Sequence, residues 1–138
     1  MEGNLYVVGT PIGNLSDLSI RAKDTLGLVD LIAAEDTRVT KVLLNYYNIQ
    51  TSITSYHEKN EIYKADKLID DILSGKNIAL VSDAGTPCIS DPGYRLVNLA
   101  RLKDIKTITI PGPCAATSAL SISGLPTDHF YFEGFLPL

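Results

Sequence analysis

The amino-acid sequence predicts an α/β fold: an open, mostly parallel five-stranded sheet with helices on both faces. Three observations favour this fold class. Short apolar runs alternate along the chain with longer segments of helical periodicity. The runs are apolar at nearly every position, which is typical of parallel strands that are covered on both sides. With 138 residues, of which 45% are hydrophobic, the chain is long enough for one core of this kind.

Five runs have the character of strands. They are Leu5 to Gly9, Leu31 to Ala34, Ile53 to Tyr56, Ile78 to Ser82 and Thr107 to Ile110. The final stretch, HFYFEGFLPL, is predicted to be one more extended, aromatic-rich segment. Its phenylalanines need a following element to cover them. We therefore expect residues 1–125 to form one α/β domain and residues 126–138 to begin the connection to a second domain.

The clearest helix is predicted in NEIYKADKLIDDILSGK. Its apolar residues share one helical face, Asn60 can cap the start, and Gly75 suits the first position after the end. In DPGYRLVNLARL, Asp91 is the expected N-cap and Pro92 the first helical residue, because proline loses no hydrogen bond there.

Three further helices are predicted from weaker patterns. Residues 17–28 and 37–47 show partial helical periodicity, and PCAATSALSISG reads as a small-residue helix that ends at Gly124. No internal repeat or low-complexity segment interrupts this order of elements.

Composition narrows the function classes. No run of about 18 apolar residues occurs and the start lacks the layout of a signal peptide, so we expect a soluble, cytoplasmic protein with no membrane partner. Cys88 and Cys114 have no metal-ligand spacing and are expected to be reduced thiols without a catalytic role; no metal is expected. The 12 Lys and Arg against 16 Asp and Glu give a net charge of −4, so a nucleic-acid partner requires a local basic patch.

The turns that follow the predicted strands are the places to look for a site, because ligands of open α/β sheets bind beyond the carboxyl ends of the strands. Three of these turns, GTPIGN, DAGTPCISDPG and PGPCAA, are rich in glycine and proline. Glycine lets a ligand approach the backbone closely, and proline reduces the entropy that ordering costs. Any one of them could be an ordinary tight turn, but three at one edge favour a binding site.

Two aspartates in the longest turn are interpreted differently. Asp83 follows a strand directly, so its carboxylate is expected to project into the crevice and to accept hydrogen bonds from a ligand. Asp91 precedes Pro92 and a helix, which capping alone explains. No Glu or His accompanies the pair at ligand spacing, which disfavours a metal site.

Three other residues are candidates for catalysis. Glu35 lies 22 residues after Gly13 at a strand end, where dinucleotide-binding folds place a ribose-binding acid. Arg38 could hold a phosphate or form an ion pair with Glu35 or Asp36. His57 follows a strand and could act as a general base. The sequence contains neither G-x-G-x-x-G nor G-x-x-x-x-G-K-[ST], so a dinucleotide oxidoreductase remains only a minor alternative.

Four long blocks resemble the ribosomal RNA small-subunit methyltransferase I family, a branch of the tetrapyrrole methylase superfamily. The blocks are VVGTPIGNLSDLSIRA, LIAAEDTR, NIALVSDAGTPCISDPGYRLV and IPGPCAATSALSISGLPTDHFYFEGFLP, and they occur in the order of the family. The resemblance implies S-adenosylmethionine-dependent 2′-O-methylation of a cytidine ribose in 16S rRNA, with small-subunit rRNA or the 30S subunit as substrate. It also implies a homodimer in which the donor binds between two α/β domains.

Carried over by position, the resemblance assigns the methyl donor to the three glycine- and proline-rich turns. The implied contacts are Thr10, Pro11, Gly13, Asp83, Ala84, Gly85, Thr86, Cys114 and Ala115. Many superfamily relatives have Gly-Asp-Pro where this chain has Ser82-Asp83-Ala84, and the SDAGTP form is typical of the rRNA branch. The resemblance assigns no general base.

Two departures limit the implied function. Family members have about twice this length, so the chain corresponds to the N-terminal half and is expected to be inactive alone. The acidic composition supports RNA binding only if Arg21, Lys23, Arg38 and Lys41 gather into a patch. A non-catalytic module that dimerises and presents RNA is therefore the main alternative.

Overall fold

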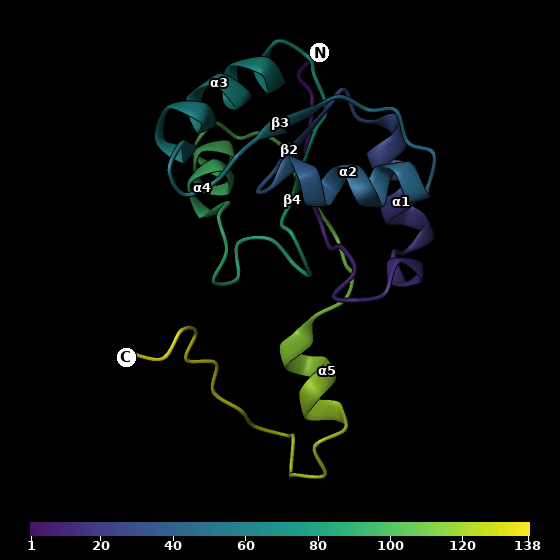
Figure 1. Ribbon diagram of the computed structural model, residues 1–138. Coiled ribbons are helices and arrows are strands. Elements are labelled where there is room, and N and C mark those ends of the chain that lie inside the picture. Colours follow the sequence, from purple (N-terminus) through teal and green to yellow (C-terminus); the bar gives the residue numbers. More distant parts are fainter.

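The computed structural model describes residues 1–138 and contains a single five-stranded sheet in which every pairing is parallel (Figure 1). The order across the sheet is β3-β2-β4-β1-β5. The strands are β1 (Leu5–Val8), β2 (Leu31–Ala34), β3 (Ile53–Ser55), β4 (Ile78–Val81) and β5 (Thr107–Ile110). The helices are α1 (Ile20–Leu28), α2 (Thr37–Tyr46), α3 (Glu61–Leu73), α4 (Tyr94–Leu102) and α5 (Ala115–Ser121), with a short 3-10 turn at Leu15–Asp17. The predicted fold class is confirmed.

The direction of the connections decides which helix covers which face. The chain moves from β1 to β2 and β3 in one direction across the sheet, and then from β3 to β4 and β5 in the other. Because parallel crossovers are right-handed, the helices of the two directions must lie on opposite faces. Accordingly α1 and α2 pack on one face, and α3 and α4 pack on the other (Figure 1).

Each face of the sheet has its own hydrophobic core. In β4, Ala79 and Val81 point into the core below α1 and α2, whereas Ile78 and Leu80 point into the core below α3 and α4. All four are almost completely buried. This explains why the strand is apolar at every position, as a strand covered on both sides must be.

The end of α3 was predicted correctly, and its start only in part. Gly75 has a φ of 110°. Its N–H and that of Lys76 donate to the carbonyls of Ile72 (2.9 Å) and Asp71 (3.1 Å), which satisfies the last turn of α3. Asn60 stands at the N-cap, but its side chain makes no capping bond and instead accepts from the backbone N–H of His57 at 2.9 Å.

The predicted start of α4 was wrong. The helix begins at Tyr94, two residues after Pro92, and its N-cap is Gly93 with a φ of 135°. An added Cβ at Gly93 would lie 2.7 Å from Cys88 Sγ and 2.8 Å from a methyl carbon of Leu80. The chain therefore enters the helix through a position that only glycine can occupy, and Asp91 does not cap it.

The segment after β5 leaves the body of the domain. α5 buries none of its residues and ends at Ser121, short of the predicted Gly124, and no strand follows it (Figure 1). The final stretch, predicted to be extended and aromatic-rich, pairs with no strand of the sheet. Large hydrophobic side chains remain exposed after α5: Ile122, Leu125, Phe130, Tyr131, Phe132, Phe135, Leu136 and Leu138. None of the five helices has the length and apolarity that a membrane crossing requires.

Replacement of Gly93 by alanine is expected to lower the free energy of unfolding by about 2 kcal/mol or more, because it adds backbone strain and a clash with the core. The matched control is Gly27→Ala in α1, where an added Cβ meets nothing within 4 Å. This control is expected to gain up to about 1 kcal/mol from helix propensity. Urea unfolding followed by circular dichroism measures both, and equal stabilities of the two variants would contradict this account of the α4 start.

Candidate functional site

The turns after β1 and β4 are bound to each other at the carboxyl edge of the sheet. The backbone N–H of Thr10 donates to the carbonyl of Gly85 at 3.0 Å, and the N–H of Gly85 donates back at 3.1 Å. The hydroxyl of Thr10 also donates to the carbonyl of Ser82 at 3.3 Å. Thr10, Ser82 and Gly85 are buried. This reciprocal pair continues the contact between two strands beyond the sheet and fixes the spacing of their turns.

The turn after β5 crosses the turn after β1 in backbone contact. A Cβ added at Gly9 would lie 2.8 Å from the backbone of Gly112, and one added at Gly112 would lie 2.9 Å from the carbonyl oxygen of Gly9. Only two glycines allow this approach. The three glycine- and proline-rich turns therefore converge at one edge, as the sequence predicted.

This edge includes the topological switch point of the sheet. β1 and β4 are neighbours, yet the chain leaves β1 for α1 on one face and leaves β4 for α4 on the other. Turns that diverge in this way open a crevice outside the carboxyl ends of the strands, which is where open α/β sheets bind ligands.

A second pair of contacts joins the turn after β4 to the turn after β2. Asp83 Oδ1 accepts a hydrogen bond from the backbone N–H of Asp36 at 2.9 Å. In return, Glu35 Oε2 accepts from the backbone N–H of Asp83 at 3.4 Å. Asp83 itself is exposed to solvent. One oxygen of its carboxylate is held by the Asp36 N–H, and the residue still borders the space where a ligand was predicted.

Glu35 is the partly buried carboxylate of this pair. Burial raises its pKa, and the negative charges of Asp83, Asp91 and Asp36 add to the increase, while its hydrogen bond from the Asp83 N–H opposes it. A raised pKa means that ionisation of Glu35 opposes folding. The cost is absent below the ordinary pKa of the carboxyl and is fully present above the raised value.

Arg38 is occupied by an ion pair. Its Nε and Nη2 donate to the two carboxylate oxygens of Asp36 at 3.0 and 2.8 Å, although its side chain is 89% exposed. Hydrogen bonds from Arg38 lower the pKa of Asp36 to about 2. Of the two roles left open by the sequence, the structure shows the ion pair with Asp36.

Two kinds of hollow border the Asp83 contact. The first has a volume of about 230 Å³ and a mostly apolar surface, between the turn after β1 and α2. It is lined by Thr10, Pro11, Leu15, Val39, Thr40, Val42, Leu43, Ser82 and Asp83. Sequence reasoning missed the residues from α2, although exposed valines three residues apart on that helix were an available signal.

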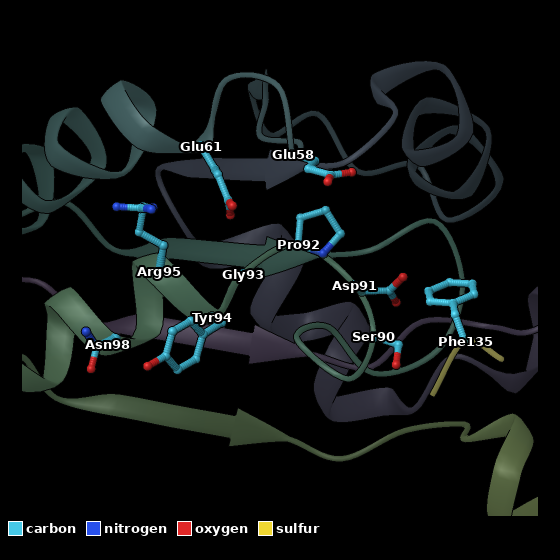
Figure 2. Close-up of a pocket in the computed structure, with 10 residues that line it drawn as sticks. All are labelled: Glu58, Glu61, Ser90, Asp91, Pro92, Gly93, Tyr94, Arg95, Asn98 and Phe135. Carbon is cyan, nitrogen blue, oxygen red and sulfur yellow. The ribbon is translucent and has the colours of Figure 1, made fainter. Parts of the chain in front are cut away.

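The second kind of hollow is polar and lies beside the turns after β2, β3 and β4. One part, of about 480 Å³, is lined by Glu35, His57, Glu58, Lys59, Ser90, Asp91, Pro92 and Phe135. Another part, of about 500 Å³, shares five of these residues and extends along α4 to Tyr94, Arg95 and Asn98. Figure 2 shows the side chains of this second part, with Phe135 of the C-terminal segment at one end.

The structure does not gather every candidate residue. Gly13 has a φ of 145° in an exposed turn, and an added Cβ there meets nothing within 4 Å. Cys114 caps the exposed helix α5 and Ala115 begins it, and neither lines any of these hollows. His57 borders the polar hollow beside Glu35, which places two of the three catalytic candidates together.

A parallel sheet with glycine-rich turns that meet at a switch-point crevice defines an α/β ligand-binding domain. The chain belongs to the tetrapyrrole (corrin/porphyrin) methylases, whose family model matches residues 4–136.

Close relatives carry a common name, ribosomal RNA small subunit methyltransferase I. The chain is 59% identical to that of Vibrio cholerae over 96% of this chain and 46% of the relative. It is 54% identical to that of Escherichia coli O157:H7, over 99% of this chain and 48% of the relative. It is 57% identical to that of Halalkalibacterium halodurans, over 99% of this chain and 47% of the relative. The chain therefore spans about half the length of these relatives.

A solved structure shares the fold. The uroporphyrin-III-C-methyltransferase of Thermus thermophilus superimposes with a TM-score of 0.67 at 22% identity, over 92% of this chain and 54% of that chain. At this identity the likeness supports the fold alone.

The two cysteines are expected to differ in reactivity. Burial raises the pKa of Cys88 to about 11, whereas hydrogen bonds from Thr117 lower the pKa of Cys114. Because the thiolate is the nucleophile, Cys114 should react with iodoacetamide at least about tenfold faster at pH 8. The rates are measured by mass spectrometry in Cys88→Ser and Cys114→Ser variants. Equal rates would contradict the assigned environments.

Proposed function

We propose that this chain supplies one half of the donor site of an S-adenosylmethionine-dependent methyltransferase that acts on small-subunit rRNA. One observation carries the proposal: the turns after β1, β4 and β5 are fixed against one another at the switch point of a tetrapyrrole methylase domain. Turns that expose their backbone N–H and C=O groups can hold a donor in one orientation, with its S–CH₃ bond toward the acceptor. Such positioning supplies much of the catalysis of a methyl transfer.

The residues present fit the donor chemically. Gly85 has a φ of 81° and is held by its backbone pair with Thr10, and the neighbouring Ala84 is exposed, so a ligand can approach the turn at Ala84. Asp83 can accept hydrogen bonds from ammonium or ribose hydroxyl groups, and the adjoining apolar hollow offers a surface for a flat ring. When bound, S-adenosylmethionine supplies an electrophilic methyl group on a sulfonium.

The proposed donor contacts come from the turns after β1, β4 and β5. They are Thr10, Pro11, Gly13, Asp83, Ala84, Gly85, Thr86, Cys114 and Ala115. Thr10 and Gly85 act mainly through their backbone pair, which sets the shape of the crevice. Cys114 and Ala115 stand at the end of the crossing turn from β5.

The proposed acceptor is the 2′-hydroxyl of a cytidine ribose in 16S rRNA, presented by the 30S subunit in the cytoplasm. The names of relatives at 54–59% identity over nearly the whole chain support an rRNA substrate. Of the four basic residues proposed for an RNA patch, Arg38 is paired with Asp36, and Arg21 donates to the carbonyl of Thr109 at 2.8 Å. Most RNA contacts are therefore proposed to come from outside this chain.

The complete enzyme is proposed to be a homodimer with a second domain that covers the C-terminal segment. The large apolar side chains exposed after α5 support this, because a concentration of exposed apolar side chains is typical of an interface. Residues 1–125 would then form the first domain and residues 126–138 would begin the connection. The isolated chain would lack part of the donor site and have no activity.

Asp83→Asn is expected to weaken binding of S-adenosylmethionine by about tenfold or more, since a hydrogen bond to a charged group contributes about 1.5–3 kcal/mol. The amide oxygen can still accept from the Asp36 N–H, so the turn keeps its contact. The control Asp66→Asn removes the same charge from an exposed position of α3.

Calorimetric titration of a protein with the full length of the relatives measures both affinities. Unchanged affinity in Asp83→Asn would remove this residue from the site. Absence of donor binding by the unsubstituted protein would instead favour the non-catalytic RNA-presenting module.

Amide hydrogens of residues 126–138 are expected to exchange at least about 100-fold more slowly in the full-length protein than in the isolated chain, because the second domain would cover them. Hydrogen exchange followed by mass spectrometry measures the difference. Residues of the buried strand β4 serve as the internal reference, because both forms contain it. Equal exchange of the C-terminal segment in the two forms would argue against the proposed cover.

A further inference from the structure

The carboxyl edge of the sheet is divided into two halves. The turns proposed for the donor follow β4, β1 and β5, which are consecutive in the sheet order. The remaining strands, β3 and β2, end at Ser55 and Ala34. His57 and Glu35 follow these two ends and line the polar hollow of about 480 Å³. A reaction between two molecules needs space for both, and this hollow is the space next to the donor half.

Glu35 stands at the boundary between the halves. It lines the polar hollow, and its carboxylate accepts a hydrogen bond from the backbone N–H of Asp83, a residue that lines the apolar hollow on the donor side. Of the lining residues that come from the turns after β2 and β3, Glu35 is the one with a hydrogen bond to Asp83. Arg38, the other charged candidate of this turn, is held by Asp36.

Several residues of the polar hollow suit parts of a nucleotide, while Glu35, Glu58 and Asp91 give its walls negative charge. Lys59 and His57 can meet a phosphate, and Ser90 can hydrogen-bond a sugar. Phe135 and Pro92 offer apolar surface to a base, and stacking on aromatic side chains is how proteins hold an unstacked nucleotide. The walls of this hollow come from three separate turns and the C-terminal segment, so the tertiary structure forms it.

We propose that the polar hollow takes the acceptor nucleotide and that Glu35 is the general base that removes the proton of its 2′-hydroxyl. The inference rests on the proposed function. In the step, the O–H proton passes to a carboxylate oxygen of Glu35 as the ribose oxygen forms a bond to the methyl carbon. The S–CH₃ bond breaks and its electron pair stays on sulfur, which leaves a neutral thioether. The negative charge of Glu35 and the positive charge of the sulfonium disappear together, so charge balances.

The surroundings of Glu35 strengthen it as a base. Burial raises its pKa, and Asp83 and Asp91 from the turn after β4, with Asp36 from its own turn, add like charge. From the turn after β3, His57, Glu58 and Lys59 line the same hollow. A carboxylate whose pKa is moved toward neutrality is a better proton acceptor at the working pH than an ordinary one. The reaction rate should therefore rise with pH as Glu35 loses its proton.

The test uses a protein with the full length of the relatives, tritiated S-adenosylmethionine and 30S subunits that lack the methyl group. Glu35→Gln is expected to lower kcat by about 100-fold or more and to remove the pH-dependent rise below neutrality. Glu35→Asp should recover part of the rate, because it restores a carboxylate. Donor affinity by calorimetry should change by no more than about twofold in Glu35→Gln, since the glutamine oxygen can still accept from the Asp83 N–H. Asp66→Asn, on the exposed surface of α3, is the charge-matched control.

Each outcome separates the two claims. Full kcat in Glu35→Gln, with donor bound and subunits methylated by the unsubstituted protein, overturns the role of Glu35 and leaves the proposed function standing. A fall in donor affinity that accounts for the whole loss of rate also overturns it, because Glu35 would then only position Asp83. An unsubstituted protein that neither binds donor nor methylates 30S subunits overturns both claims. Retained far-ultraviolet circular dichroism and unfolding midpoint show that the variants fold.

Discussion

The structure of the candidate site depends on backbone contacts between turns that are far apart in the chain. The reciprocal hydrogen bonds of Thr10 and Gly85 hold the turns after β1 and β4 together, and the crossing of Gly9 and Gly112 brings in the turn after β5. Side chains are almost absent from these contacts. The crevice is therefore rigid at its base while its rim, at Asp83 and Ala84, stays open to solvent. Such a base is preorganised, which lowers the entropy that ligand binding costs.

The sheet order gives this edge a second property. Because β4 lies between β2 and β1, its turn contacts the neighbours on both sides. On one side it pairs with Thr10, and on the other it exchanges hydrogen bonds with Glu35 and Asp36. The turn after β4 therefore links the glycine-rich half of the edge to the half that carries titratable side chains. A domain with the strands in chain order would separate these groups.

The C-terminal segment has a different character from the body of the domain. Up to β5, most large apolar side chains of the sheet are buried in one of two cores or packed against them. After α5 the large apolar side chains are exposed, and Phe135 lines the same hollow as Ser90 of the turn after β4. The chain spans about half the length of its relatives, and the interface proposed above would use this segment. Phe135 of this segment lines one end of the polar hollow.

The local features of this protein were largely determined by the sequence itself. Continuous apolar runs predicted all five strands to within a residue at their ends, since a strand buried on both faces leaves a signal in its own residues. Gly75 was predicted as the helix stop for an equally local reason, the positive φ that this position requires. The resemblance of long blocks to a known family pointed to the same edge of the sheet.

Other features were decided only by the tertiary structure. Asp91 has the local character of a helix cap, yet Gly93 starts α4 because the packing of Cys88 and Leu80 leaves no room for a side chain. The contact between Glu35 and Asp83 joins residues 48 positions apart, and it exists because β2 and β4 are neighbours in the sheet. Strand order is a property of the whole packed chain. No local pattern encodes it, and the pairing of groups at the site follows from it.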